Sequence, residues 1–224
     1  MNDYLTDSFK QAVNDYSFLM DNDYPEKPAL KLVGDRYRLT GLQRTVLFRG
    51  ITSTGKARSR QAKITREPKG KKLYVDGYNV LFTIMNYLMG KTLFISNDGF
   101  LRDSGGTYGG IEDETIFYKA VELLFDFIKK SGVDPVFVYL DSPVSGSVSH
   151  KNELERRMRR WEIDGEVVLV KSADAQLKKQ TGGIIATSDS EIIDAADCHV
   201  FDPARNCLET KFKIKILDLR DVTP

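Results

Sequence analysis

Aspartates close several apolar stretches of this chain, and carboxylates in such positions can act together. Asp76, Asp141 and Asp189 each end an apolar run, and Asp174 follows another run closely. Carboxylates that converge repel one another and raise each other's pKa unless a cation holds them. Hard oxygen ligands favour Mg²⁺ or Mn²⁺, and a divalent ion beside a phosphodiester activates water and stabilises the leaving oxygen. These residue types therefore indicate metal-dependent hydrolysis of phosphodiester bonds.

Alternating strands and helices would bring these aspartates together. From residue 73 onward, apolar runs alternate with stretches of helical spacing, which predicts βαβ units and a mainly parallel sheet. Ligands of such sheets bind at the carboxyl edge, and right-handed crossovers place the carboxyl ends on one side. The expected strands are 73–76, 135–141, 166–170, 183–189 and 199–201, and the expected helices are 79–89, 112–130, 152–161, 175–179 and 190–196.

Three further strands are expected outside this alternation. Residues 92–96 and 100–102 flank an Asp-Gly turn, which is a strong hairpin signal. Apolar residues alternate along 208–217, which predicts a strand at the margin of the sheet.

The start of the chain predicts a separate helical module. Apolar spacing indicates a helix over 6–20, and Thr40 with Gln43 forms a capping-box pattern before another helix. Between residues 31 and 72 bases greatly outnumber acids, which fits either a polyanion footprint or an ordinary solvated surface. We therefore divide the chain into a basic helical module (1–66), a linker (67–72) and an α/β domain (73–224).

Each aspartate taken alone also has a structural explanation. Asp76 or Asp174 could simply cap the helix that follows it. Other chemistries lack their motifs: His150 and His199 have no partner motif, no GxSxG surrounds a serine, and the glycine pairs at 105–110 lack the GK[ST] of a phosphate-binding loop. The recurrence of aspartates at strand ends is the signal that remains.

The segment Val75-Asp76-Gly77-Tyr78-Asn79-Val80-Leu81 closely resembles the first-strand motif of PIN-like nucleases of the NYN type. Ser172-Ala173-Asp174 and Thr187-Ser188-Asp189 resemble two later elements, although the helix after the former reads Ala175-Gln176-Leu177. The resemblance covers roughly residues 73–203. It implies a three-layer α/β/α sandwich with a mainly parallel sheet that cleaves RNA, or sometimes DNA, with Mg²⁺ or Mn²⁺. Together with its helical module, the chain resembles an uncharacterised, mainly archaeal family.

The resemblance implies roles for particular acidic residues. Asp76, Asp174 and Asp189 would be metal ligands, and Glu191 is a further candidate. Asp141 lies where related domains often carry an additional Asp, so it joins the catalytic set.

Other positions of the implied site are less settled. Asn79 would form a hydrogen bond near the scissile phosphate or hold Asp76 in place. PIN-like nucleases usually have one more acid on a helix, which Glu112, Asp113 or Glu114 could supply, although acids at a helix start also suit the helix dipole.

Cations and one aromatic side chain are candidates for contacts with nucleic acid. A basic helix could neutralise phosphates, although a solvated helix face would have the same pattern, and a tyrosine could stack on a base. The candidates are Lys151, Arg156, Arg157 and Arg160 on the helix at 152–161, Arg58 and Arg60 in the module, and Tyr78.

The sequence therefore predicts a metal-dependent nuclease that acts on RNA, with DNA as an open alternative substrate. The rival interpretation is a catalytically inactive PIN-like module that binds RNA or protein. Phosphoryl enzymes of the Toprim or phosphatase type fit less well, because the first strand offers Asp76 where Toprim has Glu, and Tyr78 where phosphatases complete DxD.

The remaining expectations concern location and assembly. No apolar run reaches the roughly 18 residues of a membrane span, and the first residues lack the basic region of a signal peptide. The only two cysteines, Cys198 and Cys207, form no CxxC motif and fit reduced thiols. We expect a cytoplasmic protein without a membrane partner, and a homodimer stays open.

Overall fold

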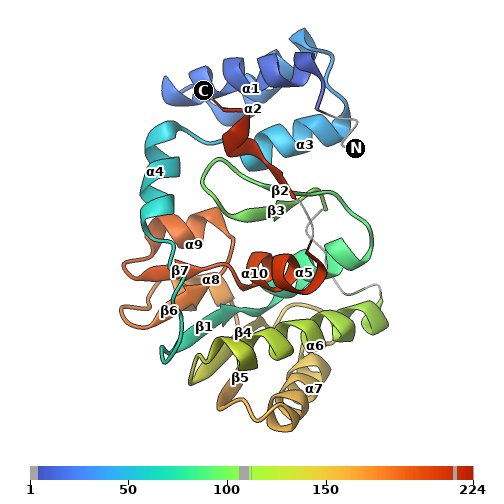
Figure 1. The fold of residues 1–224 in the computed structure, drawn as a ribbon, viewed down its shortest axis with the longest axis vertical. Coiled ribbons are helices and arrows are strands. Elements are labelled where there is room, and N and C mark those ends of the chain that lie inside the picture. The colour runs from blue at the N-terminus through green and yellow to red at the C-terminus, as the bar shows by residue number, and fades with distance from the viewer. Residues whose placement is uncertain (1–4, 106–110, 112, 214–215, 224) are drawn as a thin grey trace. The chain divides into compact units, whose positions relative to one another are not determined.

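The chain of 224 residues forms two compact units in a computed structural model that describes residues 5–105, 111, 113–213 and 216–223 (Figure 1). The first unit comprises Met1–Ala62, Lys91–Gly105 and Lys215–Pro224, and the second comprises Lys63–Gly90 and Gly106–Ile214. This differs from the division at 67–72 expected from the sequence, because the hairpin and the carboxyl-terminal residues belong to the first unit.

The first unit begins with four helices. The capping box predicted from Thr40 and Gln43 is confirmed, since each side chain bonds the other's backbone N–H. Thr6 caps the first helix through a bond from the Phe9 N–H. The helices are α1 (Asp7–Asp21), α2 (Glu26–Arg36), α3 (Gly41–Gly50) and α4 (Thr54–Ala62).

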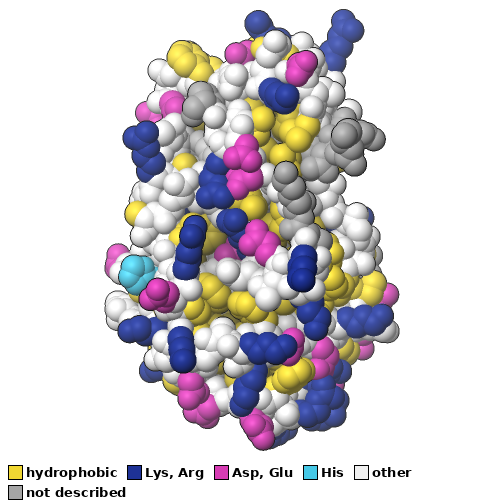
Figure 2. Space-filling model, viewed as in Figure 1, with side chains coloured by type: hydrophobic (Ala, Val, Ile, Leu, Met, Phe, Trp, Pro, Cys, Tyr) yellow, Lys and Arg dark blue, Asp and Glu magenta, His cyan; other side chains and the backbone are white. Residues whose placement is uncertain are grey.

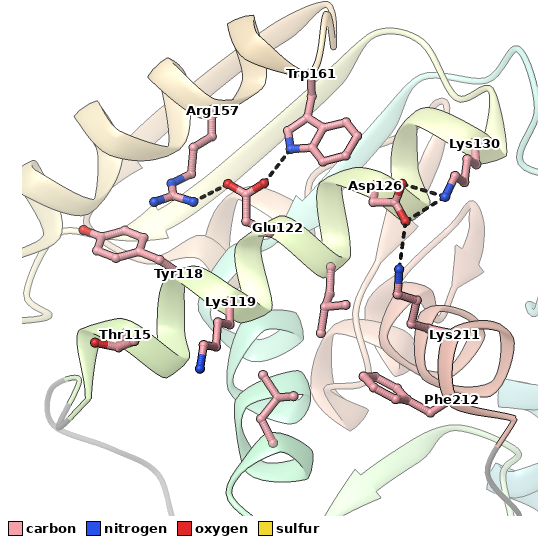
Figure 3. Close-up of a pocket in the computed structure, with 12 residues that line it drawn as sticks. Thr115, Tyr118, Lys119, Glu122, Asp126, Lys130, Arg157, Trp161, Lys211 and Phe212 are labelled. Atoms are coloured by element: carbon pink, nitrogen blue, oxygen red, sulfur yellow. Dashed lines mark hydrogen bonds and ion pairs between the residues drawn. The ribbon is translucent and has the colours of Figure 1, made fainter.

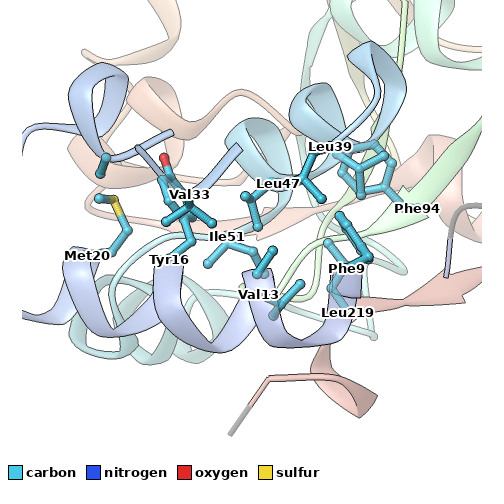
Figure 4. Close-up of a cluster of buried hydrophobic side chains, with 13 residues drawn as sticks. Phe9, Val13, Tyr16, Met20, Val33, Leu39, Leu47, Ile51, Phe94 and Leu219 are labelled. Carbon is cyan, nitrogen blue, oxygen red and sulfur yellow. The ribbon is translucent and has the colours of Figure 1, made fainter. Parts of the chain in front are cut away.

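A small sheet completes this unit. Strands β2 (Leu93–Ile95) and β3 (Leu101–Asp103) pair in antiparallel fashion, which confirms the predicted hairpin, and β8 (Leu217–Asp218) pairs with β2. Phe94 of β2 and Leu219 of the following 3₁₀ turn (Leu219–Asp221) are fully buried among apolar side chains of α1, α2 and α3 (Figure 4). The core of the unit thus draws on three separate parts of the chain.

The second unit contains a parallel sheet of five strands, as the sequence predicted. The order of the strands is β5-β4-β1-β6-β7, and every neighbouring pair is parallel. The strands are β1 (Leu73–Asp76), β4 (Val136–Asp141), β5 (Gly165–Val170), β6 (Ile184–Ala186) and β7 (His199–Phe201).

Long helices cover one face of this sheet. Helix α5 (Gly77–Leu88) packs on β1 and β4 and against α6 (Glu114–Ser131), and α7 (Ser147–Arg160) packs on β4 and β5. Helix α8 (Ala173–Leu177) connects β5 to β6 in the opposite direction across the sheet, so a right-handed crossover places it on the other face. Helix α9 (Ser190–Ala195) connects β6 to β7 on that same face.

The strand predicted over 208–217 is wrong. Residues 203–212 form helix α10 (Pro203–Phe212), which packs against α5 and α6. Asp202 caps this helix, Pro203 occupies its first turn, and Cys207 and Leu208 are buried on its inner side. Among the described residues from 208 onward, Leu217 and Asp218 form strand β8, which belongs to the first unit. In the described residues, no helix is long and apolar enough to cross a bilayer.

Candidate acidic site at the carboxyl edge of the sheet

The predicted aspartates lie at the carboxyl ends of four consecutive strands. Asp141 ends β4 and Asp76 ends β1, the central strand. Asp174 lies in α8 directly after β5, and Asp189 follows β6 as the residue that caps α9. From β1 the chain adds β4 and β5 on one side and then β6 and β7 on the other, so the strand order reverses at β1. Open α/β sheets bind ligands at such a switch point.

Side-chain alternation directs two of these carboxylates to the same face. Along β4, buried residues alternate with half-buried ones, and Asp76 of β1 stands in register with the half-buried Tyr139. Asp76 and Asp141 therefore share the face that carries Tyr139, since successive side chains in a strand point to opposite faces. Helix α8, which carries Asp174, packs on β1 and β4.

Asp76 is the electrostatic centre of the site. Its residue is only 3% exposed, and burial raises the pKa of its carboxyl to about 8. The Thr187 hydroxyl donates a hydrogen bond of 2.8 Å to Asp76 Oδ2, which lowers this pKa, while the charges of Asp174, Asp189 and Asp141 raise it. Burial and the charge of Asp189 likewise raise the pKa of Asp174. The charges of Asp141, Asp174 and Asp189 are thus close enough to act on the Asp76 carboxyl.

Asn79 ties the start of α5 to the end of β6. Its Oδ1 accepts bonds from the Ser188 N–H at 3.1 Å and the Ser188 hydroxyl at 3.2 Å, and from Thr187 Oγ1 at 3.4 Å. Of the two roles expected for Asn79, this geometry corresponds to positioning: Asn79 and Asp76 both bind Thr187. The sequence assigned no role to Thr187, although it lies in the Thr187-Ser188-Asp189 motif that supported the resemblance.

Two of the aspartates also have local structural partners. Asp189 Oδ1 accepts bonds from the Glu191 and Ile192 N–H groups, and Asp141 Oδ1 accepts one of 2.8 Å from the Ala173 N–H. Asp76, by contrast, makes no side-chain capping bond to α5. Ser172, and not Asp174, caps α8. The capping explanations for Asp76 and Asp174 are therefore wrong.

The carboxylate oxygens of this site are suitable ligands for a hard divalent cation, but the distances between the side chains are not those of a formed metal site. Four mutually repelling carboxylates, one of them buried, are the groups that Mg²⁺ or Mn²⁺ would neutralise. Within the described residues, however, no three Asp, Glu, His or Cys side chains are gathered closely enough to hold a metal ion. Asp76, Asp174 and Asp189 would have to approach one another by side-chain rotation to enclose one.

Of the additional acids expected from the resemblance, Glu191 lies at the margin of this group, where its charge also raises the pKa of Asp174. Glu191 is exposed and forms an ion pair of 3.0 Å with Lys178. Asp113 caps α6 by accepting a bond from the Ile116 N–H, and Glu114 is an exposed residue in the first turn of that helix. Glu112 lies outside the described residues.

The prediction that Tyr78 stacks on a base is wrong, because its side chain is buried. It is only 4% exposed, because α5 begins at Gly77 and turns this ring toward α6 and α7. Its hydroxyl forms a hydrogen bond of 2.9 Å with His150 Nδ1, and its ring lies against Phe82 and Phe117. Burial lowers the pKa of His150, so this histidine is a neutral core residue.

The cations of α7 are paired with carboxylates. Glu122 of α6 accepts bonds from Arg157, Arg160 and the Trp161 indole N–H, beside a hollow of about 830 Å³ (Figure 3). Arg156 pairs with Glu153, and Lys151 pairs with Glu155. Basic and acidic side chains are also interspersed on the face shown in Figure 2. Arg157 and Arg160 thus join α7 to α6, whereas Lys151 and Arg156 pair within α7, and these four cations form no single-signed track for a backbone.

The prediction that Arg60 of the helical module contacts phosphate is also wrong, because its side chain is buried. It is only 7% exposed and donates to Asp98 Oδ2 at 2.9 Å, where Arg102 also donates at 3.1 Å. This buried group pins the hairpin turn to α4 within the first unit. Arg58, two residues earlier, is exposed on the same helix.

Comparisons with known proteins place the chain in a family. Residues 65–206 match a family model described as "Domain of unknown function (DUF5616)", and residues 8–63 match one described as "Protein of unknown function (DUF434)". The chain belongs to the DUF5616 family. It is also 32% identical over 188 residues to "Uncharacterized protein MJ0935" of Methanocaldococcus jannaschii, an alignment that covers 83% of this chain and 89% of the relative.

The comparisons do not extend to a named fold. No solved structure matches the chain. Neither family description mentions a PIN or NYN domain. The meeting point of the two matches, at residues 63–65, lies between α4 and β1.

Proposed function

We propose that this protein is a metal-dependent nuclease with a PIN-like domain, and that its substrate is RNA. The observation that carries the proposal is the buried Asp76 carboxyl at the switch point of a parallel sheet, surrounded by Asp141, Asp174 and Asp189. Burial and three neighbouring aspartates raise the pKa of this carboxyl to about 8, and no cation is among the groups that shift it. Strongly shifted pKa values of this kind cluster at functional sites. The first-strand, Ala-Asp and Ser-Asp motifs support the same conclusion by resemblance.

Asp76, Asp174 and Asp189 would hold the metal ion, with Asp141 beside them. A bound divalent ion would supply an activated water and neutralise charge on the phosphate. The chain's own contribution is positional: Thr187 and Asn79 lock the end of β6 to the start of α5, so that Asp76 and Asp189 stay at the same edge.

The alternative is a binding module without catalysis. It is favoured by one observation, the lack of a closed group of metal ligands among the described residues. It also agrees with the positions of Asp113 and Glu114, which leave the acidic group without a helix acid from that part of the structure.

The deciding experiment is cleavage of a fluorophore-quencher RNA, with DNA of the same sequence as a second substrate. Chelator-treated protein is supplied with Mn²⁺, and wild type is compared with Asp76→Asn and Asp189→Asn. Asp164→Asn is the matched control, because Asp164 is exposed beside the amino end of β5. We expect Mn²⁺-dependent cleavage by wild type and the control, and a loss of at least ~100-fold in the two site variants.

A second readout separates binding of metal from cleavage. Mn²⁺ should raise the melting temperature of wild type and of Asp164→Asn but not of Asp76→Asn, since ligand that binds only the folded state stabilises it. Equal cleavage by all proteins would overturn the active-site assignment. Absence of both cleavage and Mn²⁺ stabilisation in wild type would favour the binding module.

A further inference from the structure

One face of the sheet carries a row of functional side chains that ends at Asp76. Lys72 precedes β1, and Tyr74 and Asp76 follow it at intervals of two residues, so all three point to the same face. In the next strand, Phe137 stands in register with Tyr74, and Tyr139 stands in register with Asp76. A cation, aromatic rings and a carboxylate thus succeed one another from the amino end to the carboxyl edge.

The aromatic side chains form one cluster. The centroids of Tyr74 and Phe137 are 5.5 Å apart with an interplanar angle of 26°, and those of Tyr74 and Tyr139 are 6.4 Å apart at 23°. Lys72 Nζ lies 5.8 Å from the centroid of the Phe137 ring. The three rings are half-buried, whereas the residues between them are fully buried on the opposite face.

The helices on this face leave much of the row uncovered. Helix α8 has five residues and is therefore only about 7.5 Å long, whereas the six residues of β4 span about 20 Å. Since Asp141 accepts a bond from the Ala173 N–H, α8 lies at the carboxyl end of β4. Phe137 and Tyr74, which lie further toward the amino end, remain partly open to solvent.

The charge beside the row is positive on the β1 side. Lys72, which lies on this face, is exposed, and no ion pair joins it to a carboxylate in the described part of the chain. On the β5 side the exposed Glu166 stands in register with Phe137. An anionic ligand on this face would therefore follow β1 and avoid β5.

We propose that Lys72, Tyr74, Phe137 and Tyr139 form a platform that binds single-stranded nucleic acid and leads it toward Asp76. Aromatic rings combined with cations bind single strands because unpaired bases can stack on rings while phosphates meet the charges. Bases in a duplex are already stacked on one another, so a duplex gains nothing from such rings. From Lys72 to Asp76 the row extends about 13 Å along the strand. The platform deepens the proposed nuclease function by naming its substrate class, and its binding step does not depend on cleavage.

The test is binding of a fluorescein-labelled single-stranded oligouridylate, measured by anisotropy in the presence of chelator so that no metal-dependent cleavage occurs. We expect Tyr139→Leu, Phe137→Leu and Lys72→Glu each to weaken binding by roughly tenfold, since a stacked base contributes substantially to affinity. Tyr118→Leu and Lys119→Glu are the matched controls, because both residues lie on α6 in the helix layer, with Tyr118 half-buried and Lys119 exposed. Thermal melts show that each variant folds.

Two further arms make the result decisive. The same oligonucleotide annealed to its complement should bind much more weakly than the single strand, and the platform variants should not change that binding. Equal losses in the platform and control variants, or a preference for the duplex, would overturn the platform. Asp76→Asn should keep single-strand binding within about twofold of wild type, so a failure of the nuclease assignment is distinguishable from a failure of the platform.

Discussion

At the scale of single residues, Asp76 determines how the second unit responds to pH. An unfolded aspartate ionises near pH 3.9, whereas burial keeps folded Asp76 protonated up to about pH 8. Unfolding between these values releases a proton, so the contribution of Asp76 to stability is fully present below about pH 4 and is lost as pH rises to about 8. Each pKa unit corresponds to ~1.4 kcal/mol.

The first prediction compares wild type with Asp76→Asn in chelator. The variant lacks the ionisation, so its free energy of unfolding should exceed that of wild type by an amount that grows between pH 4 and 8 and reaches roughly 3–5 kcal/mol. Urea melts at several pH values measure the difference between the two proteins. A difference from wild type that stays constant with pH for Asp76→Asn would contradict the buried, protonated state.

Thr187 is the residue through which Asp76 and Asp189 are held. Its hydroxyl donates to Asp76 Oδ2 and accepts from the Asp189 N–H at 3.0 Å, and the residue is fully buried. Thr187→Val keeps the shape but leaves both partners unsatisfied, so it should cost ~1–3 kcal/mol of stability and impair any activity of the site. Thr45→Val, which removes a hydroxyl bonded only to a helix carbonyl, should cost much less in the same melts. Equal costs would mean that the Thr187 bonds contribute nothing particular.

At the scale of elements, a helix or strand could be predicted correctly where its own residues carry the pattern that determines it. Strands β1 and β4 end in Asp76 and Asp141, and Asp189 follows β6. All three are apolar runs closed by turns, and buried parallel strands have that pattern whatever surrounds them. The segment 208–217 also alternates, yet Asp202 and Pro203 begin a helix just before it. A cap and a first-turn proline outweigh a short alternation, because they fix the backbone where the element starts.

The same distinction applies to the candidate site. Positions at strand ends could be predicted, because topology alone brings them to one edge. The surroundings of Tyr78 and Arg60 could not, because His150 and Asp98, their partners, are distant in sequence. Neither partner forms a motif with the residue that it binds.

Helices α6 and α7 are joined by a charged contact that one substitution can test. Glu122 accepts from Arg157, Arg160 and Trp161, and these donors lower the pKa of its carboxyl despite partial burial. Glu122→Gln should cost about 1 kcal/mol and shift the fluorescence of Trp161, the single tryptophan. Glu155→Gln breaks only a pair within α7, so it should cost ~0.5 kcal/mol or less and leave the emission unchanged. Unchanged emission in Glu122→Gln would show that the charge of Glu122 does not act on the Trp161 indole in solution.

At the scale of the whole molecule, the first unit is discontinuous in the chain. Its helices come from the first 62 residues, but its core includes Phe94 of the hairpin and Leu219 near the end. Both lie in segments of only two or three residues, so periodicity gave no sign that they belong with distant helices. A division at the basic stretch was therefore the natural sequence-based expectation, and it separates residues that share a core.

This arrangement predicts that a fragment of residues 1–66 will not fold as a cooperative unit, because its apolar surface lacks the covering side chains of Phe94 and Leu219. In the full chain, Leu219→Ala should cost ~2–5 kcal/mol, as expected for a fully buried leucine. Leu32→Ala is the control: Leu32 is 62% exposed on α2, and its loss should change stability by about 0.5 kcal/mol or less. Circular dichroism melts of the fragment and the two variants measure these effects. A fragment that melts as sharply as the full chain would show that the helices form a complete core alone. The hairpin and the carboxyl-terminal segment would then only pack on that core without being required for it.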